Sequence, residues 1–172
     1  MRAGLAALLL FSAAGWSQAT FPPPVGSALY LAVVPGTSGY AVVAVEVPEG
    51  WAIQAHRPTL PHLIPTVLTV DPVPGVRFGD VIYPQPERKH LAFARRELEV
   101  YTGEVLFLTP FTVALDAPPG VRRVRAELQY QACSSSACLL PEVVVLEIVL
   151  YVLPLERLPG RGAAPEGFAA LL

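Results

Sequence analysis

The sequence predicts an all-β domain, either a sandwich or a barrel. Nineteen prolines among 172 residues disfavour a helical bundle, because proline removes a backbone donor and clashes inside a helix, whereas loops and strand edges accept it. Short apolar segments are separated by turn-forming residues, and no helical periodicity extends beyond about two turns. With 53% hydrophobic and 15% charged residues, one domain of this length fills a substantial core.

The first 19 residues have the pattern of a secretory signal peptide. Arg2 precedes an apolar stretch from residue 3 to residue 14, and residues 17–19 (SQA) form a small-x-small cleavage site. The apolar stretch is shorter than the roughly 20 residues that span a bilayer. The mature chain is therefore predicted to start at Thr20, in a periplasmic or otherwise extracytoplasmic compartment where disulfides persist.

The strand pattern continues along the mature chain. Strands are expected at residues 28–34, 40–47, 51–55, 63–70, 98–107, 111–115, 123–131 and 143–153. Apolar and polar residues alternate at 123–131, which predicts a strand with one buried face. The apolar run 143–153 is too short to cross a membrane and predicts a strand buried on both faces. The Pro/Gly/Ala-rich tail 154–172 is expected to leave the domain, with a short helix at 166–172.

Charge and motifs exclude several function classes. Twelve basic against 14 acidic residues give a net charge of −2, without a basic stripe, so we expect no nucleic-acid partner. No Gly-rich phosphate loop follows a strand, and residues 134–136 (SSS) lack the surroundings of a hydrolase nucleophile. We expect no cofactor.

Cys133 and Cys138 are the only cysteines, five positions apart at a predicted strand connection where a disulfide is geometrically easy. A bridge that closes a loop of about six residues adds only about 2 kcal/mol to the free energy of unfolding. A disulfide in an exposed loop is also open to attack by a thiolate. From these residues alone, two interpretations are almost equally supported. The bridge is either redox-active, or it is a structural bridge in a non-catalytic binding module. A copper or zinc site is a weaker third possibility, because no histidine lies at ligand spacing and the mature chain has no methionine.

Three segments together carry a family resemblance. They are residues 130–142 (YQACSSSACLLPE), residues 50–58 (GWAIQAHRP) followed by 63–66 (LIPT), and residues 81–86 (VIYPQP) followed by Lys89. In this order they resemble the N-terminal periplasmic domain of DsbD-type thiol:disulfide interchange proteins. The resemblance spans roughly residues 29–151.

The resemblance implies an immunoglobulin-like β-sandwich over residues 20–153, with the cysteine pair near its C-terminal end. It also implies that the domain passes electrons from a thioredoxin-like protein, or a membrane transporter of the DsbD/CcdA type, to exported oxidoreductases or cytochrome c maturation factors. Cys138 would join the partner and Cys133 would resolve the mixed disulfide.

The resemblance further implies a cap formed by Tyr83 and Ile82 that shields the cysteine pair. His56 and Tyr130 are the candidate supporting residues, and a structural role is favoured for His56. The chain contains neither a multi-span membrane segment nor a C-x-x-C motif, so separate partners would supply the transmembrane relay. We expect a monomer.

Overall fold

A computed structural model describes residues 30–154, in which all regular structure is strand. The strands are β1 (Tyr30–Val33), β2 (Ser38–Val47), β3 (Ala52–Gln54), β4 (Val67–Val70), β5 (Val76–Phe78), β6 (Glu87–Lys89), β7 (Leu98–Tyr101), β8 (Gly103–Val113), β9 (Gly120–Tyr130), β10 (Ala132–Cys133) and β11 (Glu142–Val152). The all-β prediction is confirmed for these residues. The predicted signal peptide, the tail from residue 155 and the helix at 166–172 lie outside them.

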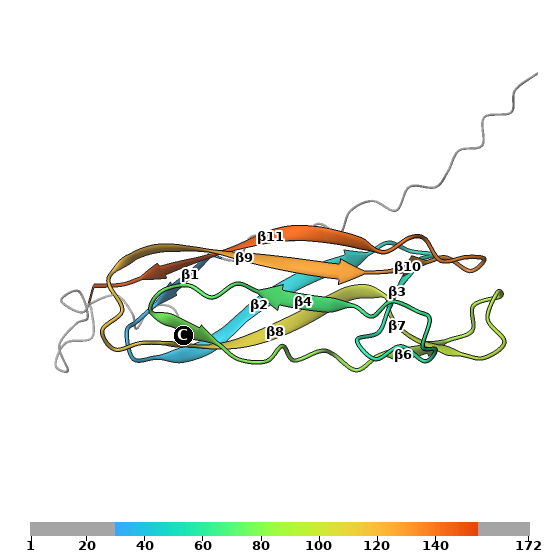
Figure 1. The fold of residues 1–172 in the computed structure, drawn as a ribbon, viewed down its shortest axis with the longest axis horizontal. Helices are drawn as coiled ribbons and strands as arrows, with labels where there is room; N and C mark the ends of the chain where they lie inside the picture. The colour runs from blue at the N-terminus through green and yellow to red at the C-terminus, as the bar shows by residue number, and fades with distance from the viewer. Residues whose placement is uncertain (1–29, 155–172) are drawn as a thin grey trace, which may run out of the picture.

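Two sheets enclose the main core (Figure 1). One has the strand order β1-β11-β9-β4, and the other has the order β2-β8-β5. The alternation predicted at 123–131 is confirmed, because every second side chain of β9 from Val124 to Tyr130 is buried in this core. On the opposite face, Arg123 and Arg125 are exposed, and Glu127 and Gln129 are half-buried.

The third sheet, in the order β10-β3-β7-β6, lies at one end of the sandwich (Figure 1). The single strand predicted at 98–107 is wrong, because the chain leaves this sheet after β7 and enters β8 through Gly103, whose φ of 60° favours glycine. The break predicted between 107 and 111 is also wrong. Strand β8 continues through Pro110, which has no N–H to offer but accepts a hydrogen bond from Gly79 N at 2.8 Å.

Strand β11 corrects the prediction of burial on both faces. Val143 and Val145 are each 56% exposed, and Tyr151 is 41% exposed, whereas the inward-facing Ile148 and Leu150 are buried. Although the run is almost entirely apolar, it forms an antiparallel strand with one buried face and one largely exposed face. Of the outward-facing residues, only Val149 is buried, at the position where β1 begins its parallel pairing with β11.

Tyr130 joins the end of β9 to the start of β11. Its side chain is buried, and its hydroxyl donates a hydrogen bond to Glu142 Oε2 at 2.7 Å, across a directly opposed residue pair. Burial, followed by the hydrogen bond to Glu142 and the charge of that carboxylate, raises the pKa of Tyr130 above its ordinary value of 10.0. Burial also raises the pKa of Tyr83 and Tyr101.

We expect Tyr130→Phe to lower the free energy of unfolding by about 1 kcal/mol at neutral pH, because the hydrogen bond to Glu142 is lost. As the pH rises past 10.0, the unfolded wild-type chain releases the Tyr130 proton while the folded chain retains it, so stability falls. The variant lacks this contribution and loses less stability. Urea unfolding across the alkaline range measures both effects; equal alkaline slopes would contradict the assignment.

Candidate functional site

The two cysteines face each other across a tight hairpin that begins at β10. Leu139 N donates to Ala132 O, and Ser134 N donates to Ala137 O, both at 2.8 Å. These bonds flank the Cys133–Cys138 pair on either side, so the cysteines form a non-hydrogen-bonded antiparallel pair, the kind in which Cα atoms approach most closely. Their Cα atoms are 3.9 Å apart, and the two sulfurs form a disulfide.

Ser134 organises the turn between the cysteines. Its hydroxyl oxygen accepts hydrogen bonds from Ser136 N at 3.2 Å and Ala137 N at 3.3 Å. A serine hydroxyl that receives backbone donors in this way closes a turn without the help of glycine. The hairpin is therefore well defined by its own hydrogen bonds, apart from the disulfide.

The two sulfurs lie in different environments. Cys133 has no exposed surface, whereas Cys138 is partly exposed. Cys133 belongs to a small second core, separate from the main core of the sandwich. Its other buried members are Ala52, Leu63, Leu91, Ala94, Leu98 and Val100, with Leu60 and Cys138 packed against them. Of the two sulfurs, Cys138 is therefore the one within reach of another molecule.

Gln54 is a member of the site that sequence reasoning missed. It lies at the end of β3 with no exposed surface, and its Nε2 donates a hydrogen bond to Cys133 Sγ at 3.0 Å. A longer contact of 3.9 Å joins the same nitrogen to Cys138 Sγ. The available signal was an amide inside the predicted apolar strand 51–55, since a buried polar side chain needs a partner.

The base of the hairpin is fixed by Gln131. Its Oε1 accepts a hydrogen bond from Ile64 N at 3.0 Å, and its Nε2 donates to Leu139 O at 3.1 Å. The predicted supporting residue Tyr130 lies at the same base, where it bonds Glu142. Strand β10 then pairs with β3, which places Cys133 opposite Ala52.

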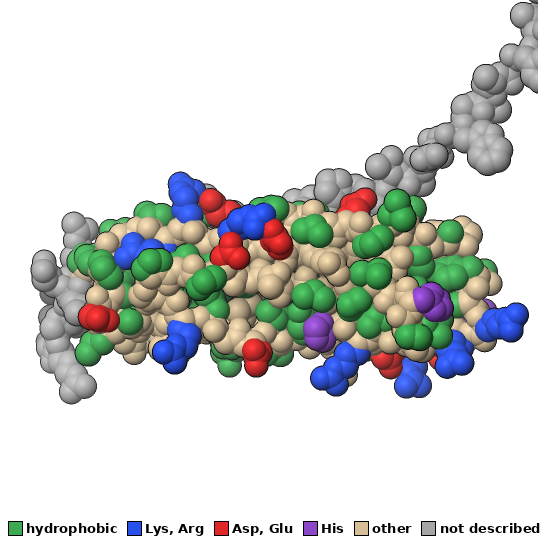
Figure 2. All heavy atoms as spheres, viewed as in Figure 1, with side chains coloured by type: hydrophobic (Ala, Val, Ile, Leu, Met, Phe, Trp, Pro, Cys, Tyr) green, Lys and Arg blue, Asp and Glu red, His purple; other side chains and the backbone are tan. Residues whose placement is uncertain are grey.

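Residues 90–97, which connect β6 to β7, cover the disulfide. Leu91 and Ala94 are buried in the same small core as Cys133, and Ala92 N donates to Ser135 O of the hairpin turn at 2.8 Å. Figure 1 shows this connection and the hairpin at the same end of the molecule. Phe93 in the connection is 41% exposed, and Figure 2 shows Lys and Arg side chains spread along the molecule, some of them at this end.

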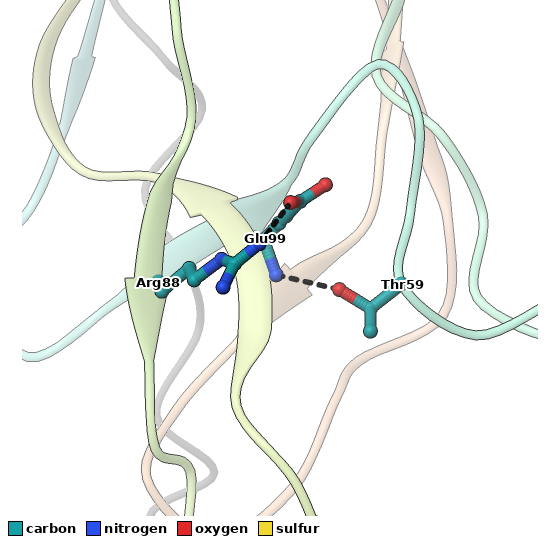
Figure 3. Close-up of polar contacts among 3 residues, drawn as sticks. All are labelled: Thr59, Arg88 and Glu99. Carbon is teal, nitrogen blue, oxygen red and sulfur yellow. Dashed lines mark hydrogen bonds and ion pairs between the residues drawn. The ribbon is translucent and has the colours of Figure 1, made fainter.

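A polar contact ties the segment after β3 to the third sheet (Figure 3). Glu99 N donates to Thr59 Oγ1 at 2.8 Å, and the Glu99 carboxylate lies 3.7 Å from the guanidinium of Arg88 on the neighbouring strand β6. The ion pair is largely exposed and contributes little. The hydrogen bond holds the segment that carries Leu60 and Leu63 against the disulfide.

The other predicted site residues lie together, in a different place. The His56 ring stacks on Tyr83, with centroids 3.7 Å apart and an interplanar angle of 9°. His56 Nδ1 lies 3.1 Å from Thr66 O, and the Tyr83 hydroxyl accepts a hydrogen bond from Leu68 N at 3.0 Å. Ile82 is 48% exposed and pairs with β8. None of these three belongs to the core around Cys133, so the cap role of Ile82 and Tyr83 stays a prediction.

The cysteines belong to no metal-ligand cluster in the part of the chain that the structure describes. Among the described residues, no group of three or more His, Cys, Asp or Glu side chains is arranged to hold a metal ion. A hollow of about 420 Å³ lies beside the His56–Tyr83 stack, and neither cysteine lines it. The chemistry available at the hairpin is that of the two sulfurs and the amide beside them.

Comparison with known proteins places the chain in a family. The family model described as "Thiol:disulfide interchange protein DsbD, N-terminal" matches residues 20–149. This chain belongs to the DsbD N-terminal domain family. The immunoglobulin-like β-sandwich predicted for such a domain, with its disulfide near the C-terminal end, is confirmed.

Two solved structures are similar to this DsbD N-terminal domain. One is the reduced N-terminal domain of DsbD from Neisseria meningitidis, at 19% identity over 62% of this chain and 74% of that chain, with a TM-score of 0.41. The other is the N-terminal periplasmic domain of ScsB from Proteus mirabilis, at 16% identity over 67% of this chain and 42% of that chain, with a TM-score of 0.48. No curated protein matches the chain. Residues 30–154 contain no helix long and apolar enough to cross a membrane.

We expect alkylation of the reduced domain to be strongly selective. A small electrophile such as iodoacetamide should modify Cys138 at least about tenfold faster than Cys133, because access limits thiol reactivity and Cys133 has no exposed surface. Peptide mass mapping of a quenched time course measures the two rates. Equal labelling under native conditions would contradict the unequal burial; labelling in denaturant is the control in which the difference should disappear.

Proposed function

We propose that this domain is an exported thiol:disulfide interchange protein that carries electrons through a reversible Cys133–Cys138 disulfide. Residues 1–19 would direct it to the periplasm. Electrons would come from a thioredoxin-like protein or a membrane transporter of the DsbD/CcdA type, and would pass to extracytoplasmic oxidoreductases or cytochrome c maturation factors. The observation that carries the proposal is a short-range disulfide with one buried sulfur and one accessible sulfur, in a chain of this family.

The position of the bridge supports exchange over stabilisation. The cysteines are five positions apart, so the bridge removes only about 2 kcal/mol of chain entropy from the unfolded state. The hairpin that it closes is already held by backbone hydrogen bonds and by Gln131. A bridge between the two main sheets would stabilise the fold more, as in antibody domains.

Electron transfer would proceed through a mixed disulfide. A thiolate of a reduced partner attacks Cys138 Sγ, the Cys133–Cys138 bond breaks, and Cys133 leaves with the electron pair as a thiolate. A second partner thiolate then attacks the partner's own sulfur in the mixed disulfide and releases Cys138. The partner dithiol is oxidised to a disulfide, and the domain gains two electrons, with protons taken up from solvent. Delivery to an oxidised client is the reverse sequence.

The connection 90–97 would shield the pair between encounters. Leu91 and Ala94 cover the Cys133 side, and the connection touches the hairpin turn through Ala92 N. No Lys, Arg or His lies between the cysteines to stabilise a thiolate there. A partly covered pair without a cationic neighbour would react slowly with unrelated disulfides, which suits a carrier in an oxidising compartment.

The first test is the reduction potential of the pair. Equilibration of the purified domain with glutathione mixtures, followed by alkylation and mass measurement, should give a value above roughly −270 mV, in the range of exchangeable pairs. The Cys133→Ser/Cys138→Ser variant is the control, and it should keep the fold while accepting no electrons. A potential below about −300 mV would mark a resistant structural bridge and favour the alternative, a non-catalytic binding module.

A second test locates the shield. Leu91→Ala should accelerate reduction of the disulfide by dithiothreitol at least about threefold, because truncation opens access to the sulfurs. Ile82→Ala and Tyr83→Ala, made in parallel, test the cap predicted from the family resemblance. Faster reduction in these two variants, with Leu91→Ala unchanged, would place the shield at Ile82 and Tyr83 and reject the one at 90–97.

A further inference from the structure

The side chain of Gln54 is the one polar group that reaches the disulfide among the described residues. Its Nε2 lies 3.0 Å from Cys133 Sγ, and the remaining atom of the amide, Oε1, is buried with no hydrogen-bond partner. Gln54 itself has no exposed surface. Within this buried amide, only the nitrogen has a hydrogen-bond partner, and that partner is sulfur. Buried polar atoms usually have partners, so the unpaired oxygen calls for an explanation.

Stability does not explain this residue. A buried acceptor without a partner costs free energy, and an apolar side chain of the same size would avoid that cost. The two preceding residues of β3, Ala52 and Ile53, are buried and apolar. The amide therefore lies at a buried position of a strand whose other two residues are apolar.

The backbone holds the amide in place beside the sulfur. Gln54 N donates to Gln131 O at 3.1 Å, and Gln54 O accepts a hydrogen bond from the Thr66 hydroxyl. Strand β3 is also paired with β7, where Gln54 lies opposite Val100. With its main chain bonded on both sides, Gln54 keeps its side chain directed at Cys133.

No charged group competes with the amide at this sulfur. The hydrophobic side chains packed around Cys133 come from β3, β7, the segment after β3 and the connection 90–97, and Gln54 is the polar side chain that contacts its sulfur. The charged and titratable side chains of the same segments lie elsewhere. Six of them are exposed: Arg57, His62, His90, Arg95, Arg96 and Glu97. His56 stacks on Tyr83, and the Glu99 carboxylate lies 3.7 Å from Arg88. A thiolate at Cys133 would therefore sit in apolar surroundings, which oppose the charge, with one hydrogen-bond donor in reach.

We propose that the Gln54 amide stabilises the thiolate that Cys133 becomes when the disulfide opens, and so directs attack to Cys138. The proposal rests on the proposed function and names the group that governs its bond-breaking step. When a thiolate attacks Cys138 Sγ, the electron pair of the broken S–S bond goes to Cys133 Sγ, which keeps the hydrogen bond from Nε2. Rotation of the amide by half a turn presents Oε1 instead, which accepts the S–H of the protonated thiol.

The test compares Gln54→Met with Gln131→Met. Both variants replace an amide that contacts the hairpin by a thioether of similar size, but the two side-chain hydrogen bonds of Gln131 go to backbone atoms and not to sulfur. Gln54→Leu serves as a second variant at the test position. The Cys133 pKa is read from thiolate ultraviolet absorbance in a Cys138→Ser background, and the exchange rate from reduction of the intact disulfide by glutathione.

Gln54→Met should raise the Cys133 pKa by about one to two units, because a hydrogen bond to a charged group is lost. Reduction by glutathione should slow by about three- to tenfold, since a leaving thiol of higher pKa departs more slowly. The melting temperature should stay the same or rise, because the unpartnered Oε1 is removed. Gln131→Met should lower the melting temperature and leave the Cys133 pKa unchanged.

An unchanged Cys133 pKa in both folded Gln54 variants would overturn the proposal, as would an equal pKa shift in Gln131→Met. The pKa is measured without any partner, so it separates this proposal from the proposed function. If the wild-type disulfide resists glutathione while Gln54→Met still shifts the pKa, the relay is rejected and the role of the amide stands. If the wild type exchanges readily and both Gln54 variants match it, only the role of the amide is rejected.

Discussion

The antiparallel pairing of β9 with β11 is the constraint on which the rest of the structure depends. The ladder runs without a break from Gly120 opposite Val152 to Tyr130 opposite Glu142. Its register determines which side chains of both strands enter the core, since a shift of one residue would turn each side chain to the opposite face. It also sets where the chain leaves the ladder, after Tyr130, and where it returns, at Glu142, and so where the cysteine hairpin begins and ends.

After β9 the chain leaves this ladder and pairs with another sheet, and this change of sheet makes the surroundings of the two sulfurs unequal. At β10 the chain stops pairing with β11 and pairs with β3 instead. One sulfur is thereby drawn under the small core of the third sheet, while the other stays at the surface. The same change brings Cys133 to the amide of Gln54. The unequal environments of two chemically identical residues follow from where one strand ends and the next begins.

Local features were predictable from the sequence, and distant ones were not. The strand at 123–131 is specified by the alternation of its own apolar and polar residues. Two cysteines five positions apart at a strand connection are close enough in the chain for a disulfide to be predicted. Gln54 reaches Cys133 across 79 positions, and Leu91 and Ala94 approach the disulfide from a connection with no strand pattern, so nothing local marks them. The burial of β11 was misjudged because apolar composition does not reveal whether a second layer covers the outer face.

The short span of the disulfide has a consequence for the lifetime of the molecule. Because the bridge encloses only the hairpin turn, opening it leaves the main core and the long ladders with the contacts they had. The dithiol form keeps this fold, but it lacks the roughly 2 kcal/mol that the bridge contributes. The reduced form therefore reaches the unfolded state roughly thirtyfold more often than the oxidised form, and a protease that acts on unfolded chains would meet it more often.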